Sequence, residues 1–164
     1  MPETPKKLRV GWFSFTCCED STIIFTELLN DYFFKWKNLL DIRYAKALKT
    51  KNILDQLDVA FVEGAISSQN QVDKLKKIRG LSTKLVAIGS CAVSGFPSAQ
   101  RNLFDIATLA EIKPILERFA YLSKVLRIDE VVKVDAVVPG CPMDEDKFLS
   151  VLGQLLIEFG IKDA

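Results

Sequence analysis

Apolar segments alternate with amphipathic segments along this chain. Short runs rich in β-branched and aromatic residues predict strands at 8–15, 41–48, 58–66, 84–90 and 131–138. Apolar positions at helical spacing predict helices over about 22–38, 51–57, 70–79, 103–110, 111–119 and 144–159. Strands that alternate with helices are typical of a doubly wound parallel sheet. Because the chain shows no linker, repeat or low-complexity tract, we expect residues 1–164 to form a single α/β domain.

Capping and helix-breaking residues refine the bounds of these helices. Short polar side chains that can cap a helix precede two of the patterns: Asp20, Ser21 or Thr22 before the first, and Ser67 or Ser68 before the helix at 70–79. Gly80 and Gly160 are expected to end helices. Pro114 is expected in the first turn of the helix at 111–119, where proline is tolerated.

All four cysteines follow predicted strands. Cys17 and Cys18 are neighbours in the loop after the first strand, Cys91 follows the fourth strand, and Cys141 follows the fifth. In an open parallel sheet, ligand sites lie outside the carboxyl ends of the strands. Three strand ends would therefore deliver four thiols to one place, a donor set typical of an iron–sulfur cluster.

Three other roles for cysteine stay open on spacing alone. A free cysteine is often a small buried hydrophobe. Disulfides form in oxidising compartments, which nothing in this sequence indicates. Structural zinc sites usually pair cysteines roughly two to four residues apart, whereas Cys17 and Cys18 are adjacent and no second pair exists.

Charge and composition exclude several functions. The chain has 22 basic and 21 acidic residues, a net charge of +1, which argues against binding to nucleic acid or to an anionic membrane surface. It has no histidine, so His-based triads, His-ligated metals and Rieske centres are excluded. The first residues show no export signal, and no apolar run is long enough to span a bilayer. We expect a cytoplasmic protein without a membrane span.

Four stretches resemble the small subunit of nickel–iron hydrogenases and its relative, the 20 kDa subunit of respiratory complex I. They occur in the expected order, over nearly the whole chain, at 12–19, 62–66, 88–95 and 138–142. The resemblance implies a flavodoxin-like α/β fold that holds one proximal 4Fe–4S cluster. It also implies that the cluster's thiolate ligands are Cys17, Cys18, Cys91 and Cys141.

The resemblance further implies a role and partners. The chain would be a non-catalytic electron-relay subunit that passes electrons between the active site of a large subunit and further iron–sulfur or flavin subunits. The large subunit would carry a nickel–iron centre in a hydrogenase, or its metal-free counterpart in a complex I relative. The first hypothesis is a cytoplasmic hydrogenase complex, and the alternative is a complex I-like or other non-hydrogenase oxidoreductase. A third hypothesis is a zinc- or flavin-binding α/β module without electron relay.

The first cysteine loop departs from the hydrogenase pattern. Hydrogenase small subunits usually carry C-x-x-C there, whereas the tandem Cys17-Cys18 resembles the complex I subunit. The stretch at 97–102 is more similar to cytoplasmic hydrogenases. Because thiolate is the ligand that iron–sulfur clusters favour, we expect both cysteines to bind iron rather than one cysteine with Asp20 or Ser21.

Several other residues beside the cysteines are candidates for the site. Three glycines are expected to let the backbone approach the cofactor, although ordinary turn geometry explains them equally well: Gly89, Gly95 and Gly140. Glu19 and Glu63 could lie on a proton path or at a subunit contact, or could be solvated or capping carboxylates. Arg101 could contact the partner or the cluster edge, or could form a surface salt bridge.

Overall fold

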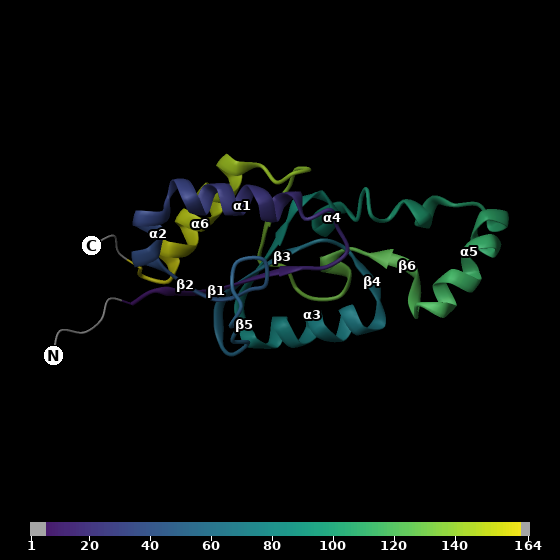
Figure 1. The fold of residues 1–164 in the computed structure, drawn as a ribbon, viewed down its shortest axis with the longest axis horizontal. Coiled ribbons are helices and arrows are strands. Elements are labelled where there is room, and N and C mark those ends of the chain that lie inside the picture. Colours follow the sequence, from purple (N-terminus) through teal and green to yellow (C-terminus); the bar gives the residue numbers. More distant parts are fainter. Residues whose placement is uncertain (1–5, 162–164) are drawn as a thin grey trace.

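A five-stranded parallel sheet forms the centre of the computed structural model, which describes residues 6–161 (Figure 1). The strands are β1 (Leu8–Ser14), β2 (Leu40–Ala45), β3 (Leu57–Glu63), β5 (Ser82–Ile88) and β7 (Ala136–Val138). They lie in the order β2-β1-β3-β5-β7, and every neighbouring pair is parallel. Numbered along the sheet's own strands this is 2-1-3-4-5, the order of flavodoxin-like folds. The predicted flavodoxin-like α/β fold is confirmed.

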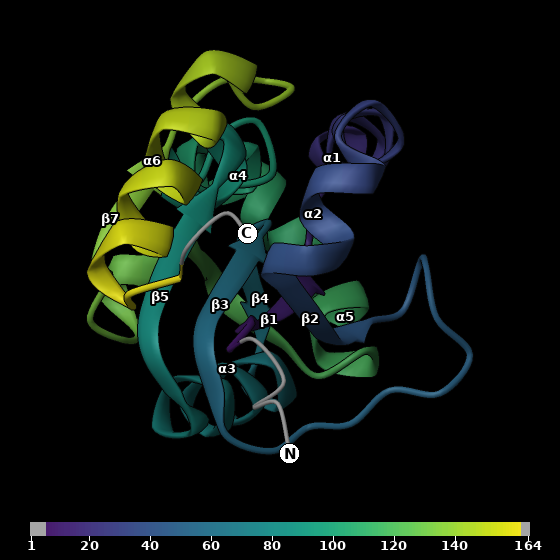
Figure 2. The same ribbon diagram turned by 90° about the vertical axis from the view of Figure 1, so that its left-hand side faces the viewer.

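Helices cover both faces of this sheet. One face carries α1 (Asp20–Asp31), α2 (Phe33–Leu39) and α6 (Glu145–Glu158), and the other carries α3 (Gln69–Leu81) (Figure 2). Successive side chains of a strand point to opposite faces, so Trp12 and Phe13 of β1 belong to different apolar clusters. The Trp12 ring stacks on Phe25 with centroids 4.3 Å apart. These two clusters pack on opposite faces of β1, β3 and β5. The cysteine loops follow β1, β5 and β7.

The first predicted helix, over 22–38, is two helices. α1 ends at Asp31 and α2 begins at Phe33. The N-cap of α1 is Glu19, which has a left-handed backbone with φ 65°, and no side chain caps it. The expectation that Asp20, Ser21 or Thr22 caps this helix is therefore wrong. Ser21 and Thr22 lie inside the first turn, and their hydroxyls form hydrogen bonds with other parts of the chain.

The helix predicted at 51–57 is also wrong, because this segment runs as a loop beside the edge strand β2. Asn52 Oδ1 accepts a hydrogen bond from Ala45 N (2.7 Å), and Ile53 N donates to Arg43 O (2.9 Å). The loop thus uses its polar groups to pair with β2 instead of forming helical hydrogen bonds. It covers an edge that would otherwise present unpaired backbone groups.

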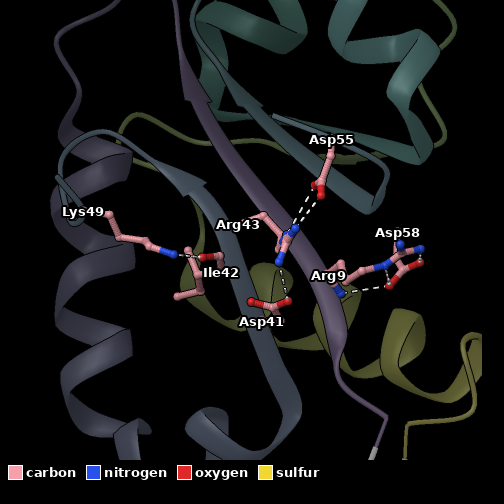
Figure 3. Close-up of polar contacts among 7 residues, drawn as sticks. All are labelled: Arg9, Asp41, Ile42, Arg43, Lys49, Asp55 and Asp58. Carbon is pink, nitrogen blue, oxygen red and sulfur yellow. Dashed lines mark hydrogen bonds and ion pairs between the residues drawn. The ribbon is translucent and has the colours of Figure 1, made fainter. Parts of the chain in front are cut away.

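Ion pairs lie on the edge strand β2 and between the starts of the inner strands β1 and β3 (Figure 3). Arg43 bonds to Asp55 and lies 3.5 Å from Asp41. Arg9 donates to Asp58 through Nη2 (2.8 Å), Nε (3.2 Å) and its backbone N (2.8 Å). Burial alone would raise the pKa of Asp58, but the hydrogen bonds from Arg9 outweigh it and the pKa lies below its ordinary value.

The strand predicted at 58–66 divides between two sheets. β3 ends at Glu63, and Gly64, with φ 92°, turns the chain into β4 (Ile66–Ser68). β4 pairs antiparallel with β6 (Tyr121–Leu126), a strand for which the sequence pattern gave no prediction. The last predicted strand, 131–138, is shortened to β7 and preceded by the 3-10 helix η2 (Ile128–Glu130).

One predicted helix cap is confirmed and one predicted helix end is wrong. The Ser68 hydroxyl accepts from Gln71 N at the start of α3. Asp144, for which no capping role was predicted, caps α6 by accepting from Lys147 N. Gly80 does not end α3, which continues to Leu81.

A protruding segment follows the third cysteine (Figure 1). The two helices predicted at 103–110 and 111–119 are one helix, α5 (Ile106–Arg118), with Asp105 as its cap. Pro114 lies in the interior of α5 rather than in a first turn. None of the α5 residues is buried, so water can satisfy the carbonyl that Pro114 leaves without a donor. No helix in residues 6–161 is long and apolar enough to cross a membrane.

Candidate metal centre

One pocket at the carboxyl edge of the sheet brings the four cysteines together. Cys17 and Cys18 reach it from the loop after β1, and Cys141 reaches it from the loop after β7. Cys91 lies in α4 (Gly89–Ser94), a short helix directly after β5, for which no helix was predicted. The structure therefore brings together the four thiols that the sequence singled out. That they bind iron stays a prediction.

The pocket is buried on one side and open on the other. Cys91 is 7% exposed and packs with Ala65, Ala99 and Val125. Cys17 is partly buried against this group, whereas Cys18 and Cys141 are exposed.

The buried side of the pocket disfavours a free thiolate. Burial and the nearby Glu63 carboxylate raise the pKa of Cys17 to about 12, so a free Cys17 is a neutral thiol at pH 7. Holding thiolate at this position needs a bound cation, because a metal ion deprotonates its thiol ligands.

The chemistry of the donor set can be compared with the needs of a zinc ion and of an iron–sulfur cluster. A tetrahedral zinc ion needs its ligands around one point, at about 2.3 Å from each sulfur. Within residues 6–161, no group of three or more His, Cys, Asp or Glu side chains is placed to hold one metal ion. Four thiols that line one pocket, in a chain without histidine, match the ligand chemistry of an iron–sulfur cluster.

Two of the three predicted glycines line the pocket. Gly89 has φ 78°, and a Cβ there would lie 2.9 Å from Ser21 Oγ. Gly140 has φ 111°, and a Cβ there would lie 2.5 Å from the Pro142 carbonyl oxygen. Both positions therefore require glycine. Gly95 is not among the residues that line the pocket and follows α4 as its C-cap, with φ 87°. A cofactor-binding role for these glycines stays a prediction.

Glu63 fastens the first cysteine loop to the end of β3. Its carboxylate is 3% exposed and accepts hydrogen bonds from Ser21 N (3.0 Å) and from the Thr22 hydroxyl (2.6 Å). The Thr22 oxygen in turn accepts from Trp12 Nε1 (2.8 Å). Burial raises the pKa of Glu63, and these hydrogen bonds oppose part of that effect. The sequence placed Glu63 beside the site but did not show that it binds the first turn of α1.

Further hydrogen bonds tie the three cysteine loops to one another. Met143 N donates to Ser21 Oγ (3.2 Å), which joins the loop of Cys141 to the first loop. Ser90 N donates to Gly140 O (2.7 Å), which joins the start of α4 to the loop of Cys141. Sequence reasoning missed these contacts, because nothing local marks two residues that are 122 positions apart as partners.

Arg101 and Asn102 hold β6 against the 3-10 helix η1 (Gln100–Leu103). Arg101 Nη2 donates to Leu122 O (2.8 Å), and Asn102 bonds to both the N–H and the C=O of Val125 (2.8 Å each). Arg101 is not among the residues that line the cysteine pocket. Glu19 lies at the exposed start of α1.

Several proteins with related sequences are named as hydrogenase subunits. The NAD-reducing hydrogenase HoxS subunit delta of Cupriavidus necator is 33% identical over 124 residues, which cover 65% of this chain and 58% of that protein. The sulfhydrogenase 2 subunit delta of Pyrococcus furiosus is 25% identical over 157 residues, which cover 88% of this chain and 60% of that protein. The chain therefore spans about three fifths of the length of these two relatives.

A solved chain from an NAD⁺-reducing [NiFe]-hydrogenase in the H2-reduced state shares the fold, with a TM-score of 0.80. It is 22% identical, and the match covers 97% of this chain and 95% of the other.

The family model described as "NADH ubiquinone oxidoreductase, 20 Kd subunit" matches residues 17–155, a span that contains all four cysteines and most of the sheet. By this match the chain belongs to the family of the 20 kDa subunit of NADH ubiquinone oxidoreductase.

Proposed function

We propose that this chain is the electron-transfer small subunit of a cytoplasmic nickel–iron hydrogenase-type complex. Its residues would form one domain that binds a single 4Fe–4S cluster through four thiolates: Cys17, Cys18, Cys91 and Cys141. The observation that carries the proposal is that all four cysteines line one pocket at the carboxyl edge of the sheet.

The residues of the pocket have different parts in this proposal. Cys91 and Cys17 would hold the inner side of the cluster, among apolar side chains. Cys18 and Cys141 would hold the side that faces solvent, where a partner subunit can approach. The bound cluster supplies one-electron transfer. Gly89 and Gly140 let the backbone come close on two sides of the pocket.

The relatives support the choice of partners. Several of them are named as the delta, gamma or G subunits of hydrogenases, which makes them parts of larger assemblies. We propose a hydrogenase-type large subunit as the direct partner, with further iron–sulfur or flavin subunits beyond it. One cluster uses all four cysteines of this chain. Electrons would therefore leave the cluster directly for another subunit, and this chain would perform no catalysis of its own.

A complex I-like or other non-hydrogenase oxidoreductase is the second candidate. The tandem Cys17-Cys18 supports it, because this arrangement resembles the complex I subunit rather than the C-x-x-C of hydrogenases. The two candidates share the cluster and differ in the large subunit. If the partner resembles hydrogenase large subunits, it should carry two C-x-x-C pairs that bind nickel and iron.

Anaerobic purification of the chain with its accompanying subunits tests the proposal. We expect a large subunit with two C-x-x-C pairs, nickel in the complex, and a paramagnetic resonance signal of the reduced cluster that appears under hydrogen. A cluster that dithionite reduces but hydrogen does not, in a complex without nickel, would exclude the hydrogenase and leave the second candidate. A complex without iron in this chain would exclude both.

A further inference from the structure

A serine hydroxyl lies against the most buried thiol of the pocket. Ser98 Oγ is 3.2 Å from Cys91 Sγ and 3.0 Å from Thr16 O. The Ser98 side chain is partly buried, and Cys91 belongs to an apolar cluster that includes Ala65 and Val125. A hydrogen bond in such surroundings is electrostatically stronger than one in water.

The hydroxyl has a single hydrogen to share between two acceptors. When Cys91 is a thiol, its S–H can donate to Ser98 Oγ while the Ser98 hydrogen points to Thr16 O. When Cys91 is a thiolate bound to iron, its sulfur has no hydrogen and carries negative charge. Hydrogen bonds to charged acceptors are roughly twice as strong as neutral ones. The Ser98 hydrogen should then move from the Thr16 carbonyl to the sulfur.

We propose that Ser98 acts through Cys91 to raise the reduction potential of the bound cluster, by donating its hydroxyl hydrogen to the Cys91 sulfur. The inference rests on the proposed function. Reduction adds one electron and makes the cluster and its thiolates more negative. A donor at a ligand sulfur stabilises that added charge, so the reduced form is favoured. Without the donor, the midpoint potential shifts to a more negative value.

The turn after α4 holds Ser98 in this position. Gly95 N donates to Cys91 O (3.1 Å), and Ala99 N donates to Gly95 O (2.8 Å). Gly95 has a left-handed backbone, and a Cβ there would lie 3.2 Å from Ala99 Cβ. This turn returns the chain towards the cysteine that it has just left. Gly95 therefore supports the site by placing Ser98, without lining the pocket itself.

Redox titration of the full chain, purified anaerobically with its accompanying subunits, tests the inference. The midpoint potential is followed by the resonance signal of the reduced cluster, and iron content is measured on each sample. Ser98→Ala should keep its iron and show a more negative midpoint than wild type. Ser94→Ala is the matched control, because Ser94 lies on α4 with Cys91 but is exposed and donates to Ser90 O (2.8 Å). Its midpoint should equal that of wild type.

A second pair of variants separates the hydrogen bond from the packing. Threonine and valine have nearly the same shape, and only threonine keeps the hydroxyl, so Ser98→Val should have a more negative midpoint than Ser98→Thr. Equal midpoints in iron-loaded Ser98→Ala and wild type, or in the Thr and Val variants, would overturn the inference and leave the cluster assignment intact. Loss of iron from the Ala and Val variants alone would also overturn it, by showing that Ser98 serves assembly rather than potential. Absence of iron from wild type would instead refute the proposed function.

Discussion

Replacing Thr22 by valine should break the polar contacts that hold the first turn of α1 against the sheet. The Thr22 hydroxyl accepts from Trp12 Nε1 (2.8 Å) and donates to the buried Glu63 carboxylate (2.6 Å). Valine has nearly the same shape as threonine but forms neither bond. The variant would leave a buried indole N–H without a partner and would remove one of the two hydrogen bonds that Glu63 accepts from the first turn.

The expected loss of stability can be worked out from these two contacts. An unsatisfied buried donor costs about 1–3 kcal/mol, and a hydrogen bond to a charged group contributes about 1.5–3 kcal/mol. One hydroxyl serves both bonds, so the losses are not independent. We expect the free energy of unfolding of the metal-free chain to fall by about 3 kcal/mol. With a denaturant slope of about 2 kcal/mol per molar urea, the urea midpoint should fall by about 1.5 M.

Urea unfolding of the full chain, followed by tryptophan fluorescence, measures this loss. Thr26→Val is the matched control, because the exposed Thr26 hydroxyl donates only to Thr22 O within the same helix (2.8 Å). Its free energy of unfolding should change by less than about 0.5 kcal/mol. If the free energies of unfolding of Thr22→Val and Thr26→Val differed by less than about 0.5 kcal/mol, the Thr22 contacts would not hold α1 in place.

Two further substitutions test the backbone of the site and the ion pair between β1 and β3. Gly140→Ala puts a methyl group 2.5 Å from Pro142 O and should destabilise the chain by at least about 2 kcal/mol, whereas Gly153→Ala in the open interior of α6 should stabilise it by about 1 kcal/mol. Similar urea midpoints for these two alanine variants would contradict the strain at Gly140. Asp58→Asn should lower the free energy of unfolding by about 1 kcal/mol at pH 7. This value is small because about half of the Arg9 side chain is exposed, where water screens the ion pair. Burial raises the pKa of Asp58, but the bonds from Arg9 lower it more, so the folded pKa lies below the unfolded value. The ion pair therefore contributes its full stability above about pH 4, and this stability is lost as the pH falls through the folded pKa. The wild-type and Asn free energies should therefore converge in acid, and a constant difference down to about pH 2 would contradict the pairing.

The sheet could be predicted from the sequence, because its central strands are continuous apolar runs. β3 is buried along its whole length, and β1 and β5 are buried except near their starts or ends, so their composition alone marks them. The segments that were missed or predicted wrongly depend on pairing with another strand. Asn52 and Ile53 bond to the edge strand β2, and β6 pairs with β4. Neither contact leaves a local pattern.

Some residues of the candidate site could be predicted from the sequence, and others could not. The four cysteines could be found because each one follows an apolar strand, and the rule for ligand sites at strand ends then brings them together. The polar residues that hold the loops could not be found. Ser21 bonds to a backbone N–H 122 residues away, and Ser98 bonds to a carbonyl 82 residues away. Serine is common in loops, so nothing in the sequence distinguishes these two from other serines.

Iron and acid-labile sulfide, measured on the anaerobically purified chain and on its four single Cys→Ala variants, test the central claim most directly. We predict about four irons and four sulfides per wild-type chain, as one cubane requires. The resonance signal of the reduced cluster should be lost or degraded in each variant: Cys17→Ala, Cys18→Ala, Cys91→Ala and Cys141→Ala. A wild-type chain with equimolar zinc and no iron would contradict the cluster. A normal cluster in Cys17→Ala would contradict the assignment of both adjacent cysteines as ligands.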